Sequence, residues 1–183
     1  MKFTETKIKG SYLIDLEYKK DNRGFFARLF CTEEFSRMKL NTKWMQINNS
    51  LSEKKGTLRG PHIQIKPYQE AKLVKCINGK VWDVVIDLRR NSSTFGQWFG
   101  VTLDHREDSM IYIPEGCGHG MLSLTDQSEV IYLASESYTP THELCLLWND
   151  SFLDIKWPIS PQILTEKEEA GLTFEEIKYL LEN

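Results

Sequence analysis

The chain has 183 residues, enough for one globular domain with a buried core. Hydrophobic residues make up 40% and charged residues 27%, an ordinary balance for a soluble protein. The net charge of −3 gives no global electrostatic footprint for nucleic acid, and no stretch approaches the roughly 18 apolar residues of a membrane span. Neither a nucleic-acid partner nor a membrane partner is therefore expected.

The four cysteines are widely scattered and form no CxxC pair, so zinc-ribbon and thioredoxin-like sites have no support. The first ten residues, MKFTETKIKG, contain no apolar signal segment. Free thiols in a reducing compartment are the default for such a chain. We therefore expect a cytoplasmic location.

The middle of the chain predicts strands. Short runs rich in Val, Ile and aromatic residues occur at 71–77, 81–88, 99–103, 110–113, 129–134 and 143–148, separated by turn signals. Several short strands at this spacing predict an all-β sandwich or barrel. In the run VWDVVIDL (81–88), one face carries Asp83 and Asp87 and the other is apolar, which suits a strand that lines a polar cavity.

Helical signals lie at the edges of the strand pattern. Residues 32–39 open with Thr32 followed by acidic residues, which predicts a short helix capped by that threonine. Thr165 with Glu168, and Thr173 with Glu176, have the spacing of a capping box. Two helices are therefore predicted in a C-terminal extension over 165–183. The chain as a whole is predicted to be one all-β domain, 1–183, with short peripheral helices.

Two of the four histidines lie in unusual segments. His62 lies in LRGPHIQ (58–64), and His119 follows a turn in IPEGCGHG (113–120). The second segment, PxGxxH, resembles the second signature of cupins, in which the turn aims a histidine into the mouth of a small β-barrel. Metal-binding cupins also have an HxH pair. Here that pair is His62-x-Gln64, and an amide is a poor replacement for imidazole at iron or zinc.

Two interpretations of these histidines stay open. A metal site of His62, Gln64, Glu70 and His119 is conceivable. Without a metal, His62 is free to act as a base, since an ordinary imidazole titrates near pH ~6.5.

Basic residues flank His62 along the chain. Arg59 precedes it and Lys72 lies on the next predicted strand, and such a cluster in one pocket would favour an anionic ligand such as a phosphate. His105 and His142 lie in polar segments and are expected to be structural or exposed.

Across nearly its whole length the chain resembles the dTDP-4-dehydrorhamnose 3,5-epimerase family of cupin-type sugar-nucleotide epimerases. The matching segments are DNRGFF (21–26), QIN (46–48), LRGPHIQ (58–64), AKLV (71–74), VWDVVIDLR (81–89), STFG (93–96), IPEGCGHG (113–120), EVIY (129–132), WND (148–150) and WP (157–158). The resemblance implies a cupin, or jelly-roll, β-sandwich. It also implies an isomerase of NDP-4-keto-6-deoxyhexoses in nucleotide-sugar and cell-surface polysaccharide biosynthesis, which inverts carbons beside the ketone.

Such an epimerisation needs a base, an acid on the opposite face and a stabiliser of the enolate oxygen, but neither a metal nor a redox cofactor. In the family pattern His62 matches the base, and Tyr132 matches the tyrosine that returns the proton. Lys72 matches the lysine near the keto oxygen. Where the family often has an Asp that orients the base, this chain has Glu168, one methylene longer. Asp83 is a second candidate for holding the imidazole tautomer.

The resemblance also implies a binding surface for the nucleotide. Arg23, Arg59 and Lys167 match positions that bind the pyrophosphate or neighbouring groups. Tyr138 matches an aromatic that stacks on the base, and Phe26 is expected to line that pocket. Other ligand contacts match Gln46, Asn48, His119 and Glu143. In the family the Arg23 segment serves the site of the other subunit, so a homodimer is implied.

Arg28 departs from the family pattern. The thymidine-specific enzymes commonly have Glu at this position, which can accept the N3–H of thymine, whereas an arginine only donates hydrogen bonds. As a base-binding residue Arg28 would suit cytosine or guanine, so CDP- and GDP-linked sugars are alternatives to dTDP. Pro61 and Cys117 stand where the family often has larger apolar or aromatic residues, which indicates an altered sugar pocket. Inversion at carbon 3, carbon 5 or both stays open.

Two functions of other kinds also remain as alternatives. The first is a metal-dependent cupin dioxygenase or isomerase, and the second is a non-catalytic binder of sugar nucleotides. The presence of His62, Tyr132 and Lys72 together argues against the binder, because binding alone needs neither an acid nor a base.

Overall fold

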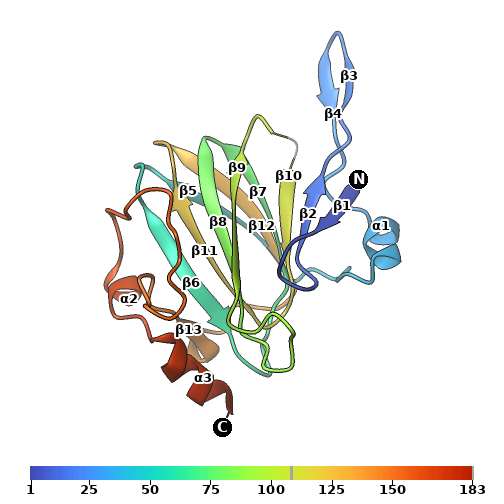
Figure 1. The fold of residues 1–183 in the computed structure, drawn as a ribbon. Helices are drawn as coiled ribbons and strands as arrows, with labels where there is room; N and C mark the ends of the chain where they lie inside the picture. Colours follow the sequence, from blue (N-terminus) through green and yellow to red (C-terminus); the bar gives the residue numbers. More distant parts are fainter. Residues whose placement is uncertain (108, 183) are drawn as a thin grey trace.

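Strand pairing builds two antiparallel sheets that face each other (Figure 1). The computed structural model describes residues 1–107 and 109–182. One sheet has the order β1 (Lys2–Glu5), β2 (Tyr12–Asp15), β10 (Ser109–Ile113), β7 (Lys72–Asn78), β12 (Ser128–Ala134) and β5 (Gln46–Ser52). The other has the order β13 (Glu143–Cys145), β6 (Leu58–Gln64), β11 (Cys117–Ser123), β8 (Lys80–Asp87) and β9 (Trp98–Asp104). The predicted all-β sandwich is confirmed.

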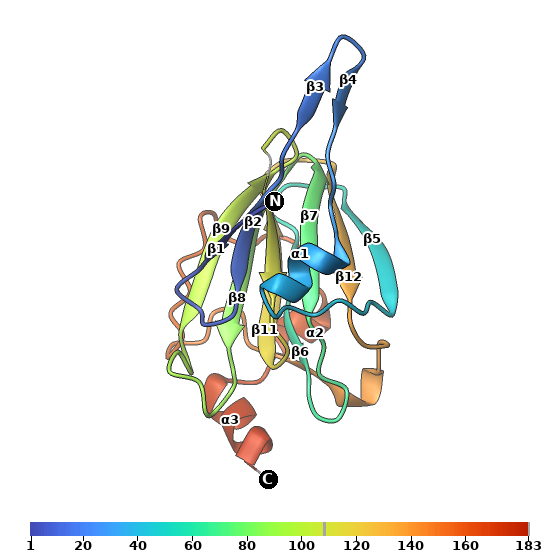
Figure 2. The same ribbon diagram turned by 90° about the vertical axis from the view of Figure 1, so that its right-hand side faces the viewer.

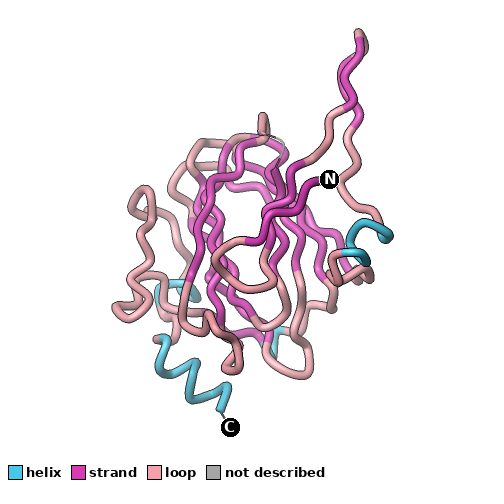
Figure 3. The backbone as a smooth tube through the Cα atoms, turned by 45° about the vertical axis from the view of Figure 1, so that its right-hand side comes forward, coloured by secondary structure: helices cyan, strands magenta, loops and turns pink. Residues whose placement is uncertain are grey.

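In the part of the chain that the structure describes, a hairpin, three short α-helices and a 3₁₀ turn (Pro140–His142) surround this sandwich. Strands β3 (Lys19–Asp21) and β4 (Gly24–Phe26) pair with each other and extend away from the body (Figures 1 and 2). The helices α1 (Thr32–Arg37), α2 (Glu166–Glu169) and α3 (Phe174–Glu182) lie at the edges of the two layers (Figure 3). Over the described ranges, no helix is long and apolar enough to cross a membrane.

Helix α1 begins differently from the prediction. Cys31, and not Thr32, has the extended N-cap conformation (φ −148°, ψ 120°), and its carbonyl accepts the N–H of Phe35 at 3.0 Å. Thr32 is therefore the first helical residue, and the prediction that it caps the helix is wrong. The helix stops early because Lys39 takes a left-handed conformation (φ 58°), and the N–H of Leu40 returns to the carbonyl of Phe35.

The two C-terminal helices begin as predicted. Glu168 Oε2 accepts the N–H of Thr165 at 3.0 Å, and Glu176 Oε2 accepts the N–H of Thr173 at 2.8 Å. Each contact satisfies a backbone donor that the helix itself leaves unpaired. The side chain of Glu168 is therefore fixed at the start of α2.

Strand β8 is buried on both faces. Val81 and Val85 pack between the sheets, in a cluster with Val74, Ile111 and Val130. The alternate side chains Trp82, Val84 and Ile86 pack against Leu153, Ile155 and Phe174 of the C-terminal segment. Full burial of such side chains contributes about 1.5–3 kcal/mol each. The C-terminal segment is thereby held on the outer face of the five-stranded sheet.

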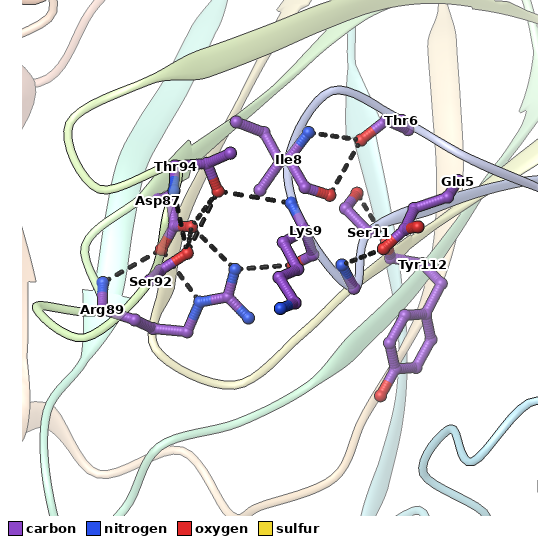
Figure 4. A network of polar contacts seen from close by, with 11 residues as sticks. Glu5, Thr6, Ile8, Lys9, Ser11, Asp87, Arg89, Ser92, Thr94 and Tyr112 are labelled. Carbon is purple, nitrogen blue, oxygen red and sulfur yellow. Dashed lines mark hydrogen bonds and ion pairs between the residues drawn. The ribbon is translucent and has the colours of Figure 1, made fainter.

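A polar network fastens the end of β8 to the N-terminal loop (Figure 4). The buried carboxylate of Asp87 accepts hydrogen bonds from Arg89 Nε at 2.9 Å and from the hydroxyls of Ser92 and Thr94. Arg89 Nη2 also donates to the carbonyl of Lys9 at 2.6 Å. Burial alone would raise the pKa of Asp87, but these donors hold it below its ordinary value. The prediction that Asp87 lines a polar cavity is wrong, because this network engages its carboxylate.

Candidate active site

A cavity of about 220 Å³ lies between the two sheets. Six of its lining residues are predicted site residues: Arg59, His62, Lys72, His119, Tyr132 and Glu168. Ser50 of β5 and Met121 of β11 complete the lining. The fold thus brings together side chains that are more than 100 residues apart in the chain. Both sheets and helix α2 contribute to this one site.

The backbone of β6 lets the two imidazoles lie on adjoining strands. His62 and His119 are register partners on β6 and β11, and a register shift follows between His119 and Met121. Gly60 has a left-handed conformation (φ 82°), and a Cβ at this position would lie 2.7 Å from the carbonyl oxygen of His119. Only glycine fits there. Gly60 is therefore what permits the close approach of the two strands.

His62 lies between two carboxylates. Its Nε2 is 3.2 Å from Glu168 Oε1, and its Nδ1 is 3.8 Å from Glu143 Oε1. Among the described residues, no well-aligned hydrogen bond reaches Nε2, so the Glu168 carboxylate lies beside the ring without a hydrogen bond of good geometry. Burial lowers the pKa of His62 to about 4; Glu143 opposes this shift and Lys167 reinforces it. The imidazole is consequently neutral at pH 7, the form that accepts a proton.

Glu168 is held in place by donors on its other sides. Its Oε1 accepts the N–H of Gly60 at 3.2 Å, and its Oε2 accepts the N–H and the hydroxyl of Thr165. Burial alone would raise the pKa of Glu168, but these hydrogen bonds and His62 hold it below its ordinary value. The side chain of Glu168 is thus long enough to reach His62 and to cap α2 at the same time.

Asp83 does not orient His62. Its Oδ2 lies 2.8 Å from Nε2 of His119, and its side chain is fully buried. The hypothesis that Asp83 holds the His62 tautomer is therefore wrong, because the register of β8 and β11 directs this carboxylate to the other imidazole. The cavity contains two separate histidine–carboxylate pairs.

Tyr132 faces the cavity from the sheet opposite His62. It lies on β12, next to β7, which carries Lys72. Burial, with the negative charge of Glu70 adding to it, raises the pKa of Tyr132 above its ordinary value of ~10. The phenol is therefore protonated at neutral pH. Lys72 Nζ lies 3.1 Å from Glu70 Oε1.

A second group of predicted ligand contacts adjoins His62. Glu143 Oε2 accepts hydrogen bonds from the hydroxyl of Tyr138 at 3.0 Å and from the ammonium of Lys167. Gln46 Oε1 accepts the N–H of Tyr138 at 2.8 Å. Asn48 is the register partner of Tyr132 on β5 and is half-buried. Gln46, Tyr138, Glu143 and Lys167 are thus linked by hydrogen bonds beside His62.

Arg23, Phe26 and Arg28, three further predicted nucleotide ligands, lie apart from both the cavity lining and the group beside His62 (Figure 1). Arg23, at the hairpin turn, pairs with Asp21 at 2.7 Å, and its side chain is 85% exposed. Phe26 is 64% exposed at the end of the hairpin. Arg28 Nη1 donates to Glu34 Oε1 at 3.2 Å. Within one chain, the fold does not bring these residues to the other site residues.

The alternative metal site lacks its amide ligand. Gln64 is buried, and its Nε2 donates to the carbonyls of Tyr68 at 3.0 Å and Ser137 at 3.3 Å. Its Oε1 accepts the N–H of Thr139. Over residues 1–107 and 109–182, no group of three His, Cys, Asp or Glu side chains gathers closely enough to hold a metal ion.

The family model described as dTDP-4-dehydrorhamnose 3,5-epimerase matches residues 5–176. The chain belongs to the dTDP-4-dehydrorhamnose 3,5-epimerase family. It is 35% identical to the Shigella flexneri enzyme of that name over 182 residues, which cover 99% of this chain and 100% of that protein. The crystal structure of the Elizabethkingia anophelis enzyme has a TM-score of 0.93 at 36% identity, covering 96% of this chain and 97% of that one. A Legionella pneumophila 3,5-epimerase in complex with dTDP-4-keto-L-rhamnose has a TM-score of 0.91 at 32% identity, covering 98% and 96%.

Two lining residues of this epimerase-family cavity were not predicted from the sequence. Ser50 lies two residues beyond Asn48 on the same face of β5, so the alternation Gln46, Asn48, Ser50 was the available signal. Met121 likewise lies two residues beyond His119 on β11. Both follow from strand periodicity once the strand itself is recognised.

Proposed function

We propose that the chain is an isomerase that epimerises a dTDP-linked 4-keto-6-deoxyhexose at the carbons beside the ketone, in rhamnose and polysaccharide biosynthesis. The observation that carries this proposal is that His62 and Tyr132 line one cavity from opposite sheets. The lowered pKa of His62 leaves it neutral at pH 7, and the raised pKa of Tyr132 leaves it protonated. A base and an acid on opposite sides of one carbon are what inversion needs.

Proton transfer is balanced in this arrangement. The imidazole of His62 takes the proton from the carbon beside the ketone, and the released electron pair forms the enolate, whose oxygen the ammonium of Lys72 stabilises. Tyr132 then gives its phenolic proton to the opposite face of the carbon, which inverts the centre. The imidazolium loses its proton to water and the phenolate regains one. Glu168 stabilises the transient imidazolium.

We assign dTDP rather than CDP or GDP as the nucleotide. To bind cytosine or guanine, Arg28 would have to turn its donors to the base, whereas its Nη1 donates to Glu34. Arg59 and Lys167 are assigned to the pyrophosphate, because both present cations at or beside the cavity. Tyr138, which is 54% exposed, is assigned to stacking on the base.

A homodimer is part of the proposal. The β3–β4 hairpin exposes 65% of Phe25 and 64% of Phe26, and β5, at the opposite edge of the six-stranded sheet from β1, exposes 71% of Ile47. Isolated two-stranded hairpins are marginally stable in water, so a partner surface would stabilise this one. We propose that the hairpin reaches a second copy of the chain and carries Arg23 to that copy's nucleotide site.

The proposed reaction requires neither a metal nor a redox cofactor, because the protein supplies the base, the acid and the cation. We also propose a cytoplasmic location. Its support is that the four cysteines are free thiols, three of them buried, as is usual for proteins of a reducing compartment.

The decisive experiment is deuterium wash-in from heavy water into dTDP-, CDP- and GDP-linked 4-keto-6-deoxyhexoses, followed by NMR at carbons 3 and 5. We expect exchange at both carbons of the dTDP sugar, because Tyr132 equilibrates with the solvent between turnovers. Exchange at one carbon would restrict the function to a mono-epimerase, and faster exchange with CDP or GDP would overturn the nucleotide assignment. Absence of exchange from all three would support a binder. Stoichiometric iron, nickel or manganese in the active protein would support the metal-dependent alternative.

A further inference from the structure

We propose that Glu143 is a positioning residue whose partner changes when a nucleoside diphosphate binds. Lys167 neutralises Glu143 until the phosphates compete for its ammonium, and Glu143 then strengthens His62 as a base. This inference rests on the proposed function, because the competing anion is the pyrophosphate of the substrate.

The two carboxylates beside His62 are held by different kinds of donor. Glu168 is bound by neutral groups, the N–H of Gly60 and the N–H and hydroxyl of Thr165, so it keeps its full negative charge. Glu143 is bound by the ammonium of Lys167 and by the hydroxyl of Tyr138. A cation neutralises a carboxylate, whereas a neutral donor does not. Glu168 is therefore a constant partner of the imidazole and Glu143 an adjustable one.

The geometry also assigns each carboxylate to one ring nitrogen. Glu168 lies 3.2 Å from Nε2 of His62, so it favours the tautomer that has its proton there. Nδ1 is then the nitrogen that takes the proton from the substrate, and Glu143 Oε1 lies 3.8 Å from it. The imidazolium formed in the reaction would have its new proton on the side of Glu143.

Charged groups from three elements act on His62. They are Glu143 of β13, Glu168 and Lys167 of α2, and Lys72 of β7. Lys167 acts twice, since its charge disfavours the imidazolium directly and also neutralises Glu143. The Lys167 side chain is 45% exposed and Glu143 is 11% exposed, so an arriving anion reaches the lysine first. A phosphate on Lys167 reverses both effects, and both reversals raise the pKa of His62.

This change of partner at Glu143 would connect nucleotide binding to proton abstraction by His62. A base with a pKa near 4 abstracts a carbon-bound proton slowly, and proton transfer becomes faster as its pKa approaches the working pH. Contacts made by the nucleotide would thus improve the reacting centre, as expected where remote binding raises kcat. A truncated substrate without the diphosphate would meet the weaker base.

The test is a histidine NMR titration with ¹³C-labelled protein, in which His62→Gln assigns the signal among only four histidines. With saturating dTDP, His62 should titrate about 1 unit or more higher than without it. Glu143→Gln should bind dTDP and lose most of that shift. Lys167→Met should raise the His62 pKa without any nucleotide, and Lys167→Arg should keep it low. Lys178→Met, at a partly exposed lysine paired with Glu175, is the matched control and should change nothing.

The outcomes separate the inference from the proposed function. If dTDP binds and His62 titrates unchanged, or shifts equally in Glu143→Gln, the partner exchange is wrong while the epimerase proposal stands. If dTDP does not bind, the proposed function is wrong, and so is the proposed change of partner at Glu143. Lys167→Met needs no ligand, and an unchanged His62 pKa in that variant would by itself overturn the inference. The signals of the remaining histidines report whether each variant is folded.

Discussion

The cavity and the β3–β4 hairpin satisfy their polar groups in opposite ways. In the cavity, His62 and His119 each have a carboxylate within 3.2 Å. On the hairpin, Arg23 pairs with Asp21 two residues away, and Phe26 is largely exposed. A site with prearranged charges can act without reorganising, whereas a hairpin with exposed aromatic side chains would gain stabilisation from a surface outside the chain. One chain thus brings His62, Lys72 and Tyr132 together, and in the proposed homodimer a second copy would add Arg23 to the nucleotide site.

Among changes in the cavity, His62→Ala should have the largest effect on activity. Removal of a general base should lower the rate of deuterium wash-in by about 10³-fold. Affinity for dTDP, measured by calorimetry, should change little, because the nucleotide contacts lie elsewhere. His105→Ala is the matched control, since His105 is exposed and contacts the carbonyl of Gly79. Near-normal exchange in His62→Ala would refute the assigned base.

Glu168→Gln should have the next largest effect. Gln can replace Glu in a capping box, so helix α2 should persist, as circular dichroism and the melting temperature can check. The imidazolium would lose its fixed negative partner, and we expect kcat to fall by about 10²-fold. Glu176→Gln makes the same change at the cap of α3, and it should leave kcat unaltered. Equal activities for the two variants would show that Glu168 serves the helix alone.

Subunit complementation tests whether Arg23 of the β3–β4 hairpin serves the nucleotide site of a second copy. Arg23→Ala should weaken dTDP binding about tenfold, the usual cost of one charge-assisted contact. Mixing this variant with His62→Ala should restore exchange, because a mixed dimer has one site with His62 from one copy and Arg23 from the other. Size-exclusion chromatography with light scattering reports whether dimers form. Failure of dimeric mixtures to regain activity would mean that Arg23 serves no partner site.

The smallest expected effect is that of pH on kcat/KM, which reports the free enzyme. Because the pKa of His62 is lowered to about 4, its neutral form persists as the pH falls through 6.5, and kcat/KM should decline only near pH 4. The raised pKa of Tyr132 places the alkaline decline above ~10. A stopped-flow profile with an acid limb at ~6.5 would contradict the desolvated base. Nucleotide binding is proposed to free Glu143 from Lys167 and so to raise the pKa of His62. The acid limb of kcat should therefore lie at higher pH than that of kcat/KM.

The predicted and unpredicted strands differ in composition. Strands β7, β8 and β12 were predicted because Val and Ile favour extended backbone. Strands β6 and β11 were not, although they contain His62 and His119, because Gly60, Pro61 and Gly118 disfavour strands. Their extended form depends on pairing with neighbours, as in the approach of Gly60 to β11.

The sequence predicted which residues form the site better than it predicted which partners those residues contact. The family resemblance supplied His62, Tyr132 and Lys72, which do line one cavity. The partner of Asp83 could not be predicted, because it depends on the register of β8 and β11 and not on any local pattern. The pairing of Arg28 with Glu34 was missed for a similar reason, since it depends on how the chain returns from the hairpin into α1.

Glu168 has a consequence for how activity arises during synthesis. One oxygen of its carboxylate closes the first turn of α2, and the other lies beside His62. Helix α2 follows every strand of the sandwich in the chain, so the base receives its partner only after the last residues have docked. A nascent chain that has completed both sheets would still lack the carboxylate of Glu168 beside His62. On the proposed mechanism, damage to the C-terminal segment would thus lower turnover by removing the carboxylate of Glu168 from His62.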